Sequence, residues 1–172
     1  MTMTINGSGT ITGLTAGGLP SATVTQATLA TPVASTGPAF RATTSGNTGC
    51  ALNTWTKIQF NTKTFDTNNN YDNTTNYRFT PTVAGYYQVN GSIGFPSYTA
   101  TYVNLVIYKN GSVYSGYGSG YNSSAGMVSF TTTDLVYLNG STDYIEIYVV
   151  QGTSGTLNAS GGVFSASMVR SA

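Results

Sequence analysis

The fold is decided by the stretch Tyr77–Ile93, which reads YRFTPTVAGYYQVNGSI. Its second half alternates in the way of a half-buried β-strand. The face expected to be buried carries Tyr87, Val89, Ile93 and Phe95, and the opposite face carries Tyr86, Gln88, Asn90 and Ser92. Pro81 ends the preceding strand because it has no N–H for a ladder, and Gly85 permits a backbone angle that larger residues resist. The stretch therefore predicts a strand end, a turn and a long strand.

The β pattern continues through the chain from Pro38 onward, and no window shows helical periodicity. Further strands are expected at residues 38–43, 56–61, 102–109, 112–115, 127–138, 143–149 and 163–169. Asn110-Gly111 and Asn139-Gly140 are hairpin-turn signals between neighbouring strands. Many short strands with regular turn signals predict an all-β sandwich or jelly roll.

The composition excludes several classes of partner. Only 6% of the 172 residues are charged and the net charge is +1, whereas about a quarter of an ordinary soluble domain is charged. Lys and Arg are scattered singly, which argues against nucleic acid, and no apolar run reaches membrane-spanning length. A surface of hydroxyl and amide groups is typical of extracellular and virion β-structures.

Catalysis is not expected. The chain has no His, so Cys50, the sole cysteine, has no base to activate it and no partner for an intrachain disulfide. The acidic residues are Asp66, Asp72, Asp134, Asp143 and Glu146. None of them has an acid/base partner, so we expect no enzyme activity. The Gly-rich run 116–121 has the wrong glycine spacing for a dinucleotide site.

A polar loop at residues 66–73 is a weak candidate for calcium binding. Asp66, Asp72 and nearby Asn side chains offer the oxygen ligands that calcium prefers. The spacing is not that of an EF-hand loop, and most polar loops of this kind are only turns. No other cofactor is expected.

Residues 1–37 form a different kind of segment. The run from Ile5 to Pro20 is rich in Gly and has no charged or aromatic residue, so it cannot build a core of its own. We expect an extended arm that lies on another protein surface or on neighbouring copies. Its anchor candidates are Ile5, Ile11, Leu14, Leu19 and Leu29. The first residues lack the basic and apolar regions of a signal peptide.

The pattern Phe79-Thr80-Pro81-x-x-Ala84-Gly85-x-Tyr87 resembles the core signature of the C1q/TNF-like jelly-roll family. Residues 38–42 look like the first strand of such domains and residues 162–169 like the last, so the resemblance spans 38–172. Upstream, Phe60, Asp66 and Tyr71 sit at the family's spacing, with one extra residue between Tyr71 and Phe79. The chain departs from the family at Val89 and Gly91, where aromatic residues are usual.

The resemblance implies a ten-stranded, two-sheet jelly roll that assembles as a homotrimer. Thirteen tyrosines in so uncharged a chain agree with it, because many rings need cover from other subunits. The candidates for trimer contacts are Tyr86, Tyr108, Tyr144 and Tyr148. Any single one of them could equally lie on a solvated surface.

The leader from Thr4 to Pro20 resembles leaders of tailed-phage fibre and virion surface proteins. Together with the jelly-roll resemblance of residues 38–172, this leader predicts a non-enzymatic virion protein. The function of that protein is open between three alternatives. A capsid decoration (cement) protein would clamp the major capsid protein, or another virion protein, with its arm. A receptor-binding fibre tip would recognise a host glycan or protein through an exposed loop with Tyr114, Tyr117 and Tyr121. A soluble C1q-like lectin is the third. An arm of 37 residues is short for a fibre stem, which favours cement.

Overall fold

The computed structural model describes residues 4–5, 11–12, 37–153 and 155–172, and within them the side chains of 37–95, 102–116, 128–153 and 155–172. The chain divides into two units, Met1–Ala34 and Ser35–Ala172. In the first unit, β1 (Thr4–Ile5) pairs antiparallel with β2 (Ile11–Thr12), and Ile5 stands opposite Ile11. The other predicted anchors, Leu14, Leu19 and Leu29, lie outside the described residues.

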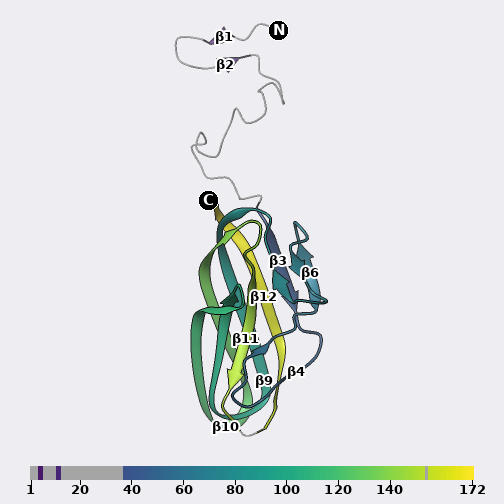
Figure 1. The fold of residues 1–172 in the computed structure, drawn as a ribbon, viewed down its shortest axis with the longest axis vertical. Coiled ribbons are helices and arrows are strands. Elements are labelled where there is room, and N and C mark those ends of the chain that lie inside the picture. Colours follow the sequence, from purple (N-terminus) through teal and green to yellow (C-terminus); the bar gives the residue numbers. More distant parts are fainter. Residues whose placement is uncertain (1–3, 6–10, 13–36, 154) are drawn as a thin grey trace. The chain divides into compact units, whose positions relative to one another are not determined.

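The second unit, which we call the head, is built from ten strands (Figure 1). They are β3 (Ala39–Thr43), β4 (Thr48–Cys50), β5 (Thr56–Lys57), β6 (Thr62–Asp66), β7 (Tyr71–Asp72), β8 (Arg78–Phe79), β9 (Ala84–Lys109), β10 (Ser112–Asn139), β11 (Ile145–Gln151) and β12 (Leu157–Ser171). Neighbouring strands pair antiparallel throughout, and the described residues of the head contain no helix. No described helix is therefore long and apolar enough to cross a membrane.

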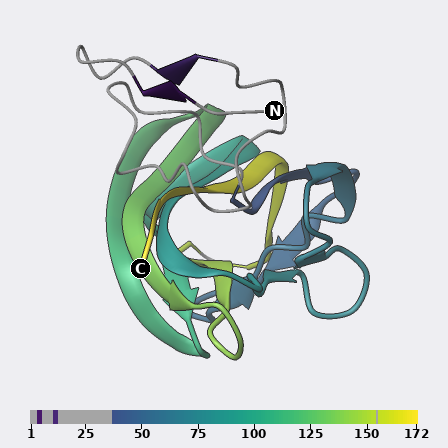
Figure 2. The same cartoon turned by 90° about the horizontal axis from the view of Figure 1, so that it is seen from above.

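Two long strands divide the head into two sheets. Residues 85–94 of β9 pair with β12, whereas its residues 103–109 pair with β11. β10 follows the same course, since its residues 128–139 pair with the first half of β9 and 112–120 with the second. The first sheet thus runs β6-β3-β12-β9-β10, and the second holds β7, β8, β5 and β11 beside the other halves of β9 and β10. Seen end-on, the strands curve around a common centre (Figure 2). The predicted all-β jelly-roll sandwich is confirmed.

The core lies between the sheets, where the alternation predicted it. Tyr87, Val89, Ile93 and Phe95 are each at most 1% exposed. The ring of Phe40 in β3 stacks on Tyr71 at 4.5 Å and on Phe79 at 4.6 Å, and meets the edge of Phe164 at 4.9 Å. The first strand, the last strand and the quoted motif therefore converge on one aromatic cluster.

Two glycines in β9 are required by close packing. Gly85 was expected to supply an unusual backbone angle, but it is not left-handed; a Cβ there would lie 2.5 Å from the Arg170 carbonyl oxygen in β12. At Gly91 a Cβ would lie 2.7 Å from Cδ1 of Ile147 in the second sheet. The Ile147 side chain thus fills the space beside Gly91, where the C1q/TNF pattern usually has an aromatic residue.

Of the two predicted hairpin turns, Asn110-Gly111 is confirmed, because it joins the paired strands β9 and β10, and Asn139-Gly140 is wrong. Asn110 and Gly111 both have positive φ (53° and 79°), which is the geometry of a type I′ hairpin. Asn139-Gly140 begins a loop rather than a hairpin, since β10 and β11 both pair with β9. Asn139 Oδ1 accepts hydrogen bonds from the N–H groups of residues 141–143, and β11 begins only at Ile145. The pattern missed β4, β6 and β7, which are five residues or fewer. It also placed a loop at 116–121, whereas that backbone belongs to β10.

Candidate functional site

Four half-exposed apolar side chains gather on the outer face of the first sheet. They are Tyr86 (42% exposed), Leu135 (49%), Tyr137 (39%) and Val169 (53%), and we call them the apolar face. They come from three adjacent strands, because β9 pairs with both β10 and β12. The rings of Tyr86 and Tyr137 stand directly opposite in the ladder, with centroids 5.5 Å apart.

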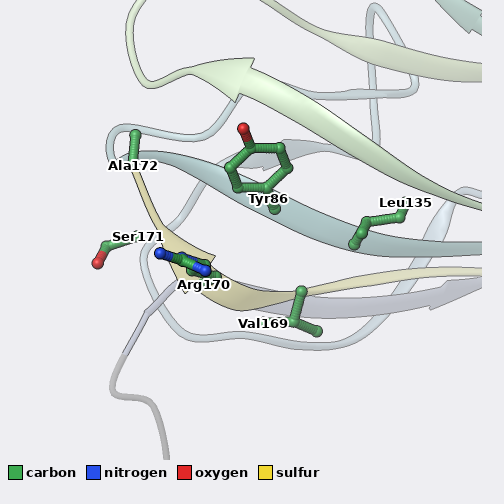
Figure 3. Close-up of a pocket in the computed structure, with 6 residues that line it drawn as sticks. All are labelled: Tyr86, Leu135, Val169, Arg170, Ser171 and Ala172. Carbon is green, nitrogen blue, oxygen red and sulfur yellow. The ribbon is translucent and has the colours of Figure 1, made fainter.

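Strand alternation explains why these residues point outward. Tyr86 precedes the fully buried Tyr87, and Leu135 and Tyr137 alternate with the buried Val136 and Leu138. The side chains of Tyr86, Leu135 and Val169 border an open hollow of about 680 Å³ beside the chain end, residues 170–172 (Figure 3). A contiguous apolar patch of this kind is typical of a protein contact surface.

The apolar face gives way to a polar row along the same strands. The Gln88 side-chain amide donates to the Thr133 hydroxyl at 2.8 Å, and that hydroxyl donates to Asn90 Oδ1 at 2.9 Å. These groups are satisfied within the sheet, so the polar row needs no partner. Burial against another protein therefore stabilises the apolar face more than it stabilises the polar row.

The four tyrosines predicted as trimer contacts fall on two different faces. Tyr86 lies on the apolar face of the first sheet. Tyr108 and Tyr148 lie on the second sheet, where their rings stack at 4.0 Å, and Tyr144 carries the Arg78 guanidinium 4.4 Å above its ring.

Sequence reasoning missed Leu135, Tyr137 and Val169. The signal was present in the run Leu135-Val136-Tyr137-Leu138, since four consecutive apolar residues in a strand indicate apolar groups on both faces. The pattern of this run by itself predicts only a strand that leads into a turn.

Asp66 and Asp72, the weak calcium candidates, hold backbone turns. Asp66 accepts hydrogen bonds from the N–H groups of Asn70 and Tyr71 and pairs with the Lys63 ammonium at 3.0 Å. Asp72 accepts hydrogen bonds from the N–H groups of residues 74–76. These hydrogen bonds keep the pKa of its carboxyl well below the usual range. In the described part of the chain, no three His, Cys, Asp or Glu side chains gather into a metal-binding group. Calcium binding stays a prediction for a titration to test.

The remaining candidates have different surroundings. Tyr114 is 46% exposed in β10, but the side chains of Tyr117 and Tyr121 lie outside the described residues. Cys50 is fully buried, and desolvation raises the pKa of its thiol to about 11. Such a thiol has no thiolate to act as a nucleophile near neutral pH.

Solved structures with the same architecture were found by comparison of folds. The globular domain of zebrafish complement 1qA is 17% identical with a TM-score of 0.63, covering 79% of this chain and 99% of that one. The head has the C1q/TNF jelly-roll fold. Murine APRIL is 10% identical with a TM-score of 0.58, covering 77% of this chain and 99% of that one.

A vertex protein of a virus shares the same fold. PRD1 vertex protein P5 is 14% identical with a TM-score of 0.52, and the match covers 79% of this chain and 99% of that one. No family model and no curated protein sequence matches the chain. At these identities the likeness establishes the fold alone.

Proposed function

We propose that the head assembles as a homotrimer through the apolar face. The observation that carries this proposal is the cluster of Tyr86, Leu135, Tyr137 and Val169, each 39–53% exposed in the single chain. In a closed ring of three, the face of one copy packs against a different surface of the next, so each copy contributes both halves of a contact. The implication of the C1q/TNF resemblance agrees with this arrangement.

We further propose that the trimer is a non-enzymatic structural protein on the surface of a phage particle, of the capsid decoration type. Three observations support this role: the fold shared with the PRD1 vertex protein, the nearly uncharged surface, and the likeness of residues 4–20 to virion leaders. The arm, residues 1–37, would clamp the major capsid protein or another virion protein. The head would project outward.

A particle-binding assay tests the decoration role. The full chain and a variant without residues 1–37 are added to particles that lack the protein, and the bound fraction is measured after sedimentation. The full chain should bind to the capsid lattice and the shortened chain should stay in solution as a folded trimer. Capsid binding by the shortened chain would contradict the clamping role of the arm. Binding of the full chain at the tail instead of the capsid would contradict the decoration role.

The second candidate is a receptor-binding tip, and the exposure of Tyr114 in β10 favours it. In that case the isolated head should bind host cells and block phage adsorption, and the Tyr114→Ala head should do so more weakly. Heads that leave adsorption unchanged would exclude this alternative.

A further inference from the structure

A polar hollow of about 540 Å³ lies beside β7 and β8, away from the apolar face. Four asparagines and three threonines contribute to its wall, together with Lys63, Asp72 and Arg78. β7 and β8 belong to the second sheet, at the opposite end of the strand order from β6. The wall also includes Lys63 of β6, at the edge of the first sheet, and none of the four residues of the apolar face lines this hollow.

The charged groups of the hollow differ in what they already bind. The Lys63 ammonium donates to Asp66 at 3.0 Å and to Asn69 Oδ1 at 3.2 Å. The Asp72 carboxylate is turned into its own loop, where it accepts the backbone N–H groups of residues 74–76. Both groups are thereby satisfied by the protein itself.

Arg78 is the exception. It stands directly opposite Asp72 in the β7–β8 ladder, yet no hydrogen bond or ion pair within the described residues uses its guanidinium. The guanidinium carbon lies 4.4 Å from the centre of the Tyr144 ring, a contact that restrains the side chain and uses none of its N–H donors. A restrained guanidinium with a free fork of donors matches the two oxygens of a carboxylate.

A strip of aromatic side chains continues from Arg78 along the outer face of the second sheet. Tyr148 lies in β11, and Tyr144 is the residue that immediately precedes this strand. Tyr148 stacks on Tyr108, and Trp55 meets the edge of Tyr108 at 6.0 Å with 37% of its surface exposed. We call Tyr144, Tyr108, Tyr148 and Trp55 the aromatic strip.

We infer that the hollow and the aromatic strip bind an acidic saccharide. The Arg78 guanidinium takes the sugar carboxylate, and the amide and hydroxyl groups of the wall take the ring hydroxyls. The exposed Trp55 ring and the partly exposed tyrosine rings of the strip cover the apolar faces of further sugar units. The hollow supplies donors that a neutral sugar does not need, which is why the ligand is expected to be acidic.

A matched pair of sugars tests this inference on the intact protein. Trp55 is the sole tryptophan of the chain, so its fluorescence reports on ligand at the strip. An oligoglucuronate should change the emission and saturate, whereas the neutral oligoglucose of equal length and linkage should bind at least tenfold more weakly. Equal affinity for the two sugars, or no response to the acidic one, overturns the inference.

Variants locate the site. Arg78→Gln should weaken oligoglucuronate at least tenfold, and Arg78→Lys, which keeps the charge but loses the fork, should weaken it several-fold. Arg41→Gln removes the same charge from β3, where the side chain bonds Thr64, and should leave affinity unchanged. If Arg78→Gln fails to fold, the affinity of Arg78→Lys for oligoglucuronate tests the role of Arg78. Unchanged affinity in the folded Arg78 variants, or an equal loss in the Arg41 variant, overturns the assignment.

Discussion

Replacing Leu135 by Glu should dissociate the proposed trimer and leave the head folded. Leu135 is 49% exposed in the single chain, while Val136 and Leu138 on the other side of β10 stay in the core. Burying a whole Leu side chain stabilises by about 1.5–3 kcal/mol, so the exposed half contributes roughly 1 kcal/mol at each contact. Three contacts in a closed ring give roughly 3 kcal/mol, and a carboxylate forced into each contact adds a penalty of several kcal/mol.

Sedimentation velocity and urea unfolding together measure this effect. At a micromolar concentration where the parent protein is trimeric, Leu135→Glu should sediment as a single chain and should unfold as one cooperative transition. Phe65→Glu is the matched control, because Phe65 is 47% exposed on β6 at the far edge of the same sheet. A trimeric Leu135→Glu protein would refute the argument, and so would equal dissociation by the control.

Three further predictions concern the head itself. Phe40→Ala removes the ring on which the aromatic cluster converges and should lower the free energy of unfolding in urea by about 3–5 kcal/mol; a loss under about 1 kcal/mol would contradict the packing. Because the folded pKa of Asp72 is lowered, its stabilisation is present above pH of about 4 and is lost as pH falls through the folded value. The thermal midpoints of the parent and Asp72→Asn should therefore differ at pH 6 and converge towards pH 2. A difference that stays constant with pH would contradict the stabilising role of the ionised Asp72 carboxylate. Cys50, buried with a pKa of about 11, should react with a thiol reagent at pH 8 only after unfolding, and rapid labelling of the native protein would show that the site is open.

The sequence predicted the parts of the fold that depend on short-range patterns. The alternation from Tyr87 to Phe95 identified the buried face of β9, because each second side chain points the same way. Asn110-Gly111 identified a tight turn, because few other residues tolerate positive φ at both positions. Residues 38–42 and 162–169 were recognised as first and last strands, and the structure brings Phe40 of the one against Phe164 of the other.

Features that depend on contacts between distant segments could not be predicted. β9 and β10 each serve both sheets, and nothing local shows that their middle residues continue a strand. A conformational role was predicted for Gly85, whereas its close neighbour is the Arg170 carbonyl in β12, 85 residues away in sequence. The four tyrosines predicted as candidates for trimer contacts divide between two faces, since alternation gives the side of a strand but not which outer face a partner covers.

The molar mass of the intact protein in solution tests the central claim most directly. Light scattering on a size-exclusion column should give three times the chain mass of 17.9 kDa, unchanged over a tenfold dilution in the micromolar range. A mass of one chain at every concentration would contradict assembly through the apolar face.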